Sequence, residues 1–482
     1  MPARDGNLPH SQTPPPDAPP GPATLPRVLG LFSATTMVIG GIIGSGIFFK
    51  ATTLAKGDLG SFGPIIGVWV LVGLHMLCGS LALAELAAML PQAGGPYVYL
   101  RDAYGKLVAF LWGWSEFWIV RTASLGALAC ATVISLNEVV PLGRTMQQAL
   151  AIAIILGLTA INVIGTRWGA SVQNVTAVMK VAFLAALIIL PAALGRTDAE
   201  NLQPLWPETL GGTFWRALGI AMIDVLWPYD GWINIAPMAE EIQRPQRNIP
   251  LALAIGSLTV ISIYVLANVS YHLSLSLSSI AHCENGVAAE TFRALFGETG
   301  AKLAALGVMC STFGATNSNL LTGPRIYFAM ARDRLLPSAL CKVHATYQTP
   351  SNSVIIQAIW SVALILAAFA WKSGPLDKPI DAFDALTDFV IFGGLLFYAL
   401  VVSSVIVLRY KNPNAPRPYR TWGYPVTPVL YLVGSAGVMV SMLLDKWAQT
   451  AAGTILILAG VVFYYWMRKH LEDPQSGQAD VA

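Results

Sequence analysis

Two short glycine-bearing segments, each inside a long apolar stretch, hold the residues best suited to bind a small charged molecule. They are Gly40-Gly41-Ile42-Ile43-Gly44-Ser45-Gly46 and Trp227-Pro228-Tyr229-Asp230-Gly231. Glycine lacks a Cβ atom, so it accepts non-helical dihedral angles and lets a ligand approach the backbone. Where a helix unwinds, the free N–H groups that begin the next half-helix can bind a carboxylate, and free carbonyl groups can bind an ammonium. One unwound segment could therefore bind both charges of a zwitterion.

The second segment adds a carboxylate to this chemistry. Pro228 removes a backbone donor and disturbs the preceding turn, and Gly231 adds conformational freedom. Asp230 is an ionisable group inside an apolar stretch, which is costly and marks a candidate functional site. Two roles stay open for it: contact with the bound molecule, or capping of a half-helix that begins near Gly231. For the first segment the alternative is helix packing, because Gly40 and Gly44 form a small-xxx-small pair.

A lysine lies inside another apolar stretch. Lys180 is near the middle of that stretch, in Val178-Met179-Lys180-Val181-Ala182-Phe183, which argues against its ammonium reaching water along the helix. A buried ammonium needs a partner. Candidates lie in Ser311-Thr312-Phe313-Gly314-Ala315-Thr316-Asn317-Ser318-Asn319, although such residues also hold helices together. Arg121 is expected to pair with Glu116 or to lie at the membrane interface rather than to bind the ligand.

The composition requires a membrane protein to position these segments. Only 11% of the 482 residues are charged and 55% are hydrophobic, whereas a soluble domain has about 25% charged residues. The net charge of +3 gives no reason to expect nucleic-acid binding, the five cysteines lack metal or redox spacing, and the six histidines are scattered. We therefore expect no cofactor, no metal site and no enzyme activity.

The apolar runs predict an all-α polytopic membrane protein with about twelve transmembrane helices of roughly 20 residues or more. Irregular backbone at membrane depth is tolerated only inside protein, and paired breaks point to the substrate site of a transporter. The breaks fall in the first and sixth spans, so 29–194 and 213–408 are expected to form two five-helix halves, and 425–467 adds two helices. The expected spans are 29–55, 63–90, 107–136, 146–164, 169–194, 213–240, 249–273, 299–330, 352–371, 382–408, 425–444 and 451–467.

The chain ends are expected to lie outside the membrane. Residues 1–28 are rich in proline and predict a disordered tail without a signal peptide, and 468–482 form a second tail. Lys and Arg are more frequent in the loops that share a side with the N-terminus. This bias predicts that both termini are cytoplasmic.

Several motifs give this chain a specific resemblance to a known family. The first-helix signature of the amino acid–polyamine–organocation superfamily resembles Val38-Ile39-Gly40-Gly41-Ile42-Ile43-Gly44-Ser45-Gly46-Ile47-Phe48. Within that superfamily the chain most resembles the L-type amino acid transporter family and its bacterial exchangers, over about residues 29–470. The further matching motifs are Glu85-Leu86, Pro91-Gln92-Ala93-Gly94-Gly95-Pro96-Tyr97, Gly113-Trp114-Ser115-Glu116, Trp227-Pro228-Tyr229-Asp230-Gly231-Trp232 and Glu240-Glu241-Ile242-Gln243-Arg244-Pro245.

The resemblance implies a LeuT-type five-plus-five inverted repeat with discontinuous helices 1 and 6, plus two further helices. It implies amino-acid transport at the plasma membrane, commonly by exchange. By position, Ile43, Gly44, Ser45 and Gly46 match the backbone site for the α-carboxylate and α-amino groups of the substrate. Trp227 matches the aromatic residue that closes over it.

Two more residues carry roles implied by the resemblance. Lys180 matches a lysine that bridges the first and eighth helices, and Tyr264 matches a tyrosine near that lysine. Tyr229 and Asp230 flank the second break, and we expect them to meet the substrate side chain. Animal members carry an external cysteine for linkage to a heavy chain, but 137–145 contain no cysteine, so no disulfide-linked heavy chain is expected.

Together these features predict a sodium-independent transporter that exchanges L-amino acids by alternating access, with neutral substrates preferred and cationic ones accepted. The alternative within the same class is a proton-coupled symporter that titrates Lys180. A non-transporting amino-acid sensor or a membrane enzyme is a remote alternative, because the chain offers neither a signalling domain nor a nucleophile–base constellation.

Overall fold

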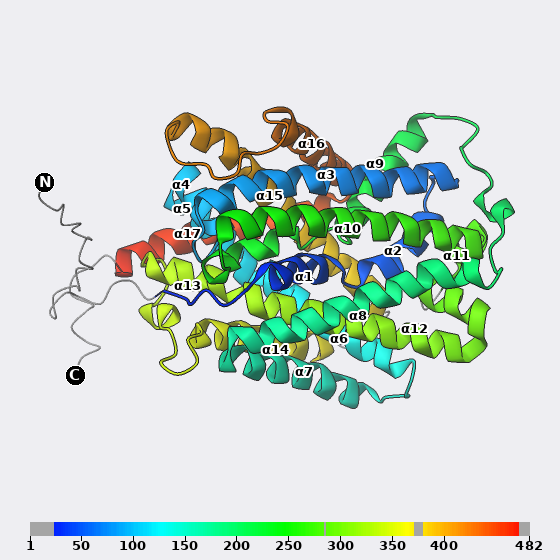
Figure 1. Cartoon of the computed structure of the whole chain (residues 1–482), viewed down its shortest axis with the longest axis horizontal. Helices are drawn as coiled ribbons and strands as arrows, with labels where there is room; N and C mark the ends of the chain where they lie inside the picture. The colour runs from blue at the N-terminus through cyan, green and yellow to red at the C-terminus, as the bar shows by residue number, and fades with distance from the viewer. Residues whose placement is uncertain (1–23, 284–285, 371–378, 472–482) are drawn as a thin grey trace, which may run out of the picture.

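The computed structural model describes residues 24–283, 286–370 and 379–471. The tails predicted for 1–28 and 468–482 lie outside these ranges for most of their length. Within the described ranges the regular structure is helical apart from one isolated bridge between Leu29 and Ile242, which confirms the all-α prediction. The helices run side by side along the long axis of the molecule (Figure 1).

The long helices are α3 (Phe62–Met89), α7 (Arg144–Ile164), α8 (Thr166–Ala193), α10 (Pro245–Ser274), α12 (Val287–Thr322), α14 (Ser351–Ala370), α15 (Pro379–Lys411), α16 (Val426–Asp445) and α17 (Trp447–Leu471). Of these, α12 is kinked at Gly297, where φ is +63°. Local signals explain some of their ends. Pro245 begins α10, where its missing N–H would have no partner in any case.

Three further spans are divided. The first consists of α1 (Leu31–Ile42) and α2 (Gly46–Lys56), and another joins α5 (Lys106–Ser115) to α6 (Arg121–Asn137) through the π-helical turn Glu116–Val120. The third consists of α9 (Gly212–Leu226) and the 3-10 segment η3 (Trp232–Glu241). The short helices are α4 (Pro96–Tyr104), α11 (Leu277–Ala281) and α13 (Pro324–Arg332), with the 3-10 turns Ala199–Leu202 and Ser338–Cys341.

Ten spans in the described ranges are long and apolar enough to cross a membrane. The predicted spans 213–240 and 299–330 are not among them. The first of these contains α9, which ends after 15 residues at Leu226, and the second contains the polar string 311–319 of α12. Both regions nevertheless pack against α1: η3 lies in the first region, and α12 in the second. Other neighbours of α1 are α8 and α10 (Figure 1).

Ion pairs close the end of the bundle that holds residues 24–30, here called the N-terminal end; α13 and the end of α17 lie there too (Figure 1). Glu240 of η3 accepts hydrogen bonds from the backbone N–H groups of Leu25 and Ala93, and pairs with Arg332 at 2.8 Å. The next residue, Glu241, pairs with Arg325 at 2.7 Å, and both side chains are fully buried.

We expect the Glu241–Arg325 pair to be essential for stability, since removal of one partner leaves an uncompensated buried charge. Arg325→Met should lower the free energy of unfolding by about 3–5 kcal/mol, measured by thermal unfolding of the purified protein in detergent. The control is Arg216→Met, because Arg216 pairs with Asp445 while its own side chain is 70% exposed; that change should cost about 0–1 kcal/mol. Equal unfolding temperatures for the two variants would contradict the assignment.

Candidate functional site

The first helix break is shorter than its glycine-rich sequence suggests. Gly40 and Gly41 remain helical, α1 ends at Ile42, and Gly46 begins α2. A Cβ atom on Gly40 would lie 2.3 Å from Nε2 of Gln173, so this glycine serves close packing against α8. On Gly44 the same atom would find its nearest neighbours at 3.9 Å. The packing alternative therefore applies to Gly40 but not to Gly44.

The second break turns where α9 ends at Leu226. Gly231 has φ +101°, in the left-handed region that side chains other than glycine rarely adopt. A Cβ on Gly231 would lie 2.4 Å from the carbonyl oxygen of Gly41, and a Cβ on Gly46 would lie 2.7 Å from Pro228. The two breaks therefore touch backbone to backbone, and glycine is needed on both sides of the contact.

Lys180 binds the first break directly. Its Nζ donates to the carbonyl oxygens of Gly40 at 2.8 Å and Ile43 at 2.6 Å, and the residue is fully buried. The partners of Lys180 are thus carbonyl groups of the break, and not side chains of the polar string 311–319. From that string, the Ser311 hydroxyl donates to the Gly44 carbonyl at 2.8 Å. A lysine of α8 and a serine of α12 therefore hold the same turn of backbone.

Tyr264 of α10 joins the two breaks. Its hydroxyl lies 3.2 Å from the Ile42 carbonyl oxygen and 3.0 Å from that of Pro228, and its side chain is fully buried. Side chains of Lys180, Tyr264 and Ser311 therefore already donate hydrogen bonds to four backbone carbonyls that could have accepted from a ligand. These are the carbonyls of Gly40, Ile42, Ile43 and Gly44. This corrects the expectation that the whole break is open to an ammonium. Gly41, which lines the pocket, lies outside this engaged set.

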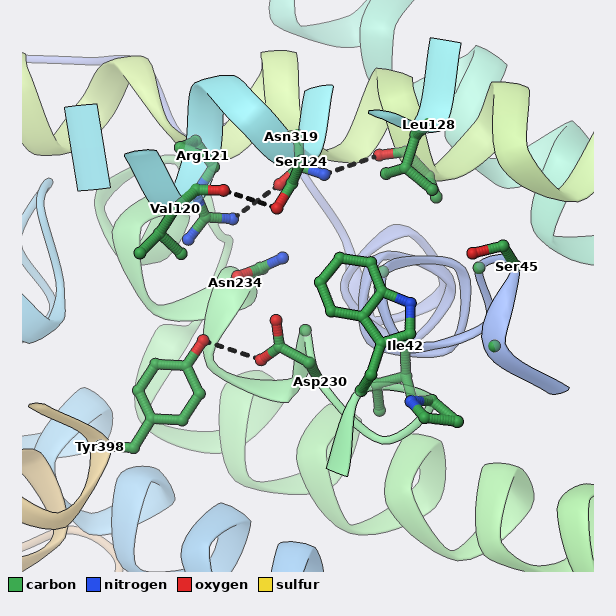
Figure 2. Close-up of a pocket in the computed structure, with 17 residues that line it drawn as sticks. Ile42, Ser45, Val120, Arg121, Ser124, Leu128, Asp230, Asn234, Asn319 and Tyr398 are labelled. Carbon is green, nitrogen blue, oxygen red and sulfur yellow. Dashed lines mark hydrogen bonds between the residues drawn. The ribbon is translucent and has the colours of Figure 1, made fainter. Parts of the chain in front are cut away.

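A pocket lies where the breaks meet (Figure 2). Its lining residues surround about 510 Å³ of atom-free space, a volume that includes the open mouth. From the breaks it is lined by Gly41, Ile42, Gly44, Ser45, Gly46, Trp227, Pro228, Asp230 and Gly231. From α6, its preceding turn, η3, α12 and α15 it is lined by Val120, Arg121, Ser124, Leu128, Asn234, Ala315, Asn319 and Tyr398.

The pocket has a backbone side, formed by the first break. Gly46 begins α2, whose N-terminal turn carries a partial positive charge that favours an anionic group. Ser45 is 1% exposed, and within the described part of the chain its hydroxyl has no hydrogen-bond partner. A ligand carboxylate at this side would meet both the helix N-terminus and an unused hydroxyl.

The opposite side of the pocket is polar and charged (Figure 2). Asp230 accepts a 2.7 Å hydrogen bond from the Tyr398 hydroxyl. Arg121 pairs with the buried Glu116 at 2.7 Å and donates to Oδ1 of Asn319 at 3.0 Å. The predicted Arg121–Glu116 pair is present, but Arg121 also faces the pocket and is not at the membrane interface. The N-cap of η3 is Gly231 and has no side-chain cap hydrogen bond, so the capping role considered for Asp230 is not the one observed; Asp230 binds Tyr398 and lines the pocket.

The structure brings Gly44, Ser45, Gly46, Trp227 and Asp230 together around one pocket. Two other predicted residues do not line it. Ile43 is buried and contributes its carbonyl to Lys180. Tyr229 is 1% exposed and packs its ring against Trp69 and Tyr264, because neighbouring side chains in the turn leave the backbone in different directions.

Sequence reasoning missed several polar residues of the pocket. Ser124, Asn234 and Tyr398 lie on three different elements and were not considered. Asn319 belongs to the polar string 311–319, which was considered only as a partner for Lys180 or for helix packing. Asn234 alone offered a signal, because it follows Gly231 by three residues and so lies about one turn into the segment after the break.

Comparison with known proteins gives a consistent result. Residues 29–470 match the family profile described as amino acid permease. The serine/threonine exchanger SteT of Bacillus subtilis is 31% identical over 447 residues, covering 92% of this chain and 98% of that protein. The human large neutral amino acids transporter small subunit 2 is 29% identical over 465 residues, covering 93% and 82%. The human b(0,+)-type amino acid transporter 1 is 28% identical over 456 residues, covering 92% and 88%.

The two glycines of the first break should differ in their effect on stability. Gly46→Ala places a methyl group 2.7 Å from Pro228, and such overpacking typically costs about 1–3 kcal/mol. Gly44→Ala has free space around its methyl group and should leave the unfolding temperature unchanged. Thermal unfolding of both variants in detergent decides the point. Equal destabilisation by the two changes would show that the breaks do not pack as described.

Proposed function

We propose that this chain, which belongs to the amino acid permease family, exchanges small neutral L-amino acids across the cell membrane without sodium. Transport of amino acids, and not enzymatic catalysis, is what the family and the similar proteins have in common. The finer proposal covers the exchange mode, the sodium independence and the preference for small or hydroxyl-bearing side chains. The last of these draws support from the similar serine/threonine exchanger.

The observation that carries the proposal is the two-sided pocket at the contact between the breaks. The substrate α-carboxylate would bind at the N-terminus of α2 beside Ser45, and the α-ammonium would be attracted by the carbonyl groups at the C-terminal end of α1. The substrate side chain would then point toward Asp230 and Asn234, where a hydroxyl finds polar partners. Trp227, which also lines the pocket, would close over the bound molecule.

We propose a matching architecture for the whole chain. The halves 29–194 and 213–408 would form a LeuT-type five-plus-five inverted repeat in which the first and sixth of twelve transmembrane helices are discontinuous, and 425–467 would add the last two. Both termini would be cytoplasmic in the plasma membrane. No disulfide-linked heavy chain would be required, since 137–145 contain no cysteine.

Lys180 supports the sodium-independent part of the proposal. Its ammonium is held by two backbone carbonyls and lies at the same turn as Ser311. Carbonyl and hydroxyl oxygens are ligands typical of a bound alkali cation, so the lysine ammonium would take the place where a sodium-coupled carrier binds an ion. This charge would tie α1, α8 and α12 together throughout the transport cycle.

Uptake of radiolabelled serine into proteoliposomes tests the proposal. Serine should enter vesicles preloaded with serine and should not enter empty vesicles. The uptake rate should be the same in sodium buffer and in choline buffer. Gly44→Ala should weaken serine binding about tenfold, because the added methyl group narrows the pocket.

The lysine is tested in the same assay. Lys180→Met should lower turnover at least tenfold, whereas Lys302→Met, at an exposed position of α12, should not. Strict sodium dependence would contradict the assignment, and uphill uptake into empty vesicles driven by a proton gradient would favour the symporter.

Asp230 should influence which side chains compete for the site. An ionised carboxylate in a partly desolvated pocket should favour cationic or hydroxyl-bearing side chains and disfavour acidic ones by one to a few kcal/mol, an order-of-magnitude figure. Asp230→Asn should therefore weaken competition by lysine and strengthen competition by glutamate, while competition by alanine stays the same. If the rank order of neutral, cationic and acidic competitors does not change, Asp230 acts only as the local acceptor for Tyr398.

A further inference from the structure

A second cavity lies behind the Asp230–Tyr398 wall of the substrate pocket. Asp230 and Tyr398 line both spaces, and the second one contains about 450 Å³ of atom-free space, mouth included. It is bounded by α3, the second break, η3, α15 and α16. The 2.7 Å hydrogen bond between the Tyr398 hydroxyl and the Asp230 carboxylate, drawn in Figure 2, therefore lies between two neighbouring cavities.

The second cavity has the lining of a site for an organic cation. Aromatic rings of Tyr229, Trp232 and Tyr431 surround it, and His75 stacks on Tyr431 with ring centroids 4.2 Å apart. Ring faces attract cations, most strongly where water is excluded, and Asp230 adds a carboxylate at the boundary. Within the described residues the buried hydroxyl of Tyr229 has no hydrogen-bond partner, so a bound ammonium could donate to it.

The charges in the first pocket disfavour a cationic substrate side chain there compared with the second cavity. Arg121 lines the first pocket and not the second. A long cationic side chain confined to the first pocket would lie near this fixed guanidinium, even though Glu116 compensates part of its charge. Behind the partition the same side chain would meet aromatic faces and the carboxylate of Asp230 instead.

The Tyr398 ring packs against Trp112 and Trp232, and only its Gly394 side is shown to be open. A Cβ atom on Gly394, one turn earlier in α15, would lie 3.6 Å from the Tyr398 ring, in ordinary van der Waals contact, and Gly394 itself lines the second cavity. The missing side chain leaves open space beside the ring. A larger residue at this position would both fill the cavity and restrain the ring.

We propose that the second cavity is a side-chain subsite for long cationic amino acids and that Tyr398 sets the length limit. With the Tyr398–Asp230 hydrogen bond intact, the transporter accepts short side chains. When the Tyr398 ring turns away, the two cavities join, and the terminal ammonium of a substrate such as ornithine or lysine binds Asp230 and the aromatic rings. This inference rests on the proposed amino-acid exchange and defines a second substrate class for the same site.

Competition against serine exchange in proteoliposomes tests the subsite. The competitors are 2,3-diaminopropionate, 2,4-diaminobutyrate, ornithine and lysine, with norvaline and norleucine as uncharged compounds of similar length. Tyr398→Ala should lower the concentration of lysine that half-inhibits serine exchange roughly tenfold. The corresponding concentrations for 2,3-diaminopropionate and for norleucine should not fall to the same extent. Tyr398→Phe, which keeps the ring but loses the hydrogen bond, should give a smaller gain in the same direction.

A filling variant tests the same idea in the opposite direction. Gly394→Leu should abolish competition by ornithine and lysine while serine exchange continues, and that exchange also reports that the protein is folded. The control is Gly437→Leu, at an exposed position of α16 with nothing within 4 Å of the added Cβ; it should change neither property. If Gly394→Leu instead prevents folding, the Tyr398 variants alone decide.

The outcomes separate this inference from the proposed function. Absence of serine exchange by the unmutated protein would overturn both. Normal serine exchange with lysine competition that responds to neither Gly394→Leu nor the Tyr398 variants would overturn the subsite alone. Equal gains for lysine and norleucine in Tyr398→Ala would show an apolar cavity without selectivity for cations, which also overturns it.

Discussion

The backbone contact between the two helix breaks is the constraint on which the rest of the structure depends. Gly41 touches Gly231 and Gly46 touches Pro228 at distances that exclude a Cβ atom. Tyr264 adds a hydroxyl shared between Ile42 and Pro228. Because the two unwound segments lie against each other, their free backbone groups and the flanking side chains converge on one pocket instead of two.

The unwound backbone is also what couples the pocket to the surrounding helices. Carbonyls released at the end of α1 are bound by Lys180 from α8, by Tyr264 from α10 and by Ser311 from α12. Buried carbonyls without partners would be costly in the membrane interior, so these three side chains stabilise the break. Any movement of α1 or α2 would therefore change the contacts of three long helices at once.

Features that depend on a short stretch of sequence could be predicted, whereas contacts between distant helices could not. The helical class, the two breaks and the burial of Lys180 followed from apolar length, from glycine and proline, and from the charge in an apolar stretch. The partners of Lys180, the inward-facing Arg121 and the wall formed by Tyr398 depend on how distant helices pack. Tyr229 was misplaced because side-chain direction in a turn follows dihedral angles, and φ +101° at Gly231 is not readable from composition.

Ion pairs close the bundle at the N-terminal end, and their chemistry determines what would be exposed to water if that end opened. An apolar seal of the same area would expose hydrocarbon to water on opening, a loss with no compensation. If this end opened, the Glu240–Arg332 and Glu241–Arg325 pairs would instead exchange their contacts for hydration. Separation at this end would therefore replace ion pairs with hydrated charges and would not expose a large hydrocarbon surface to water.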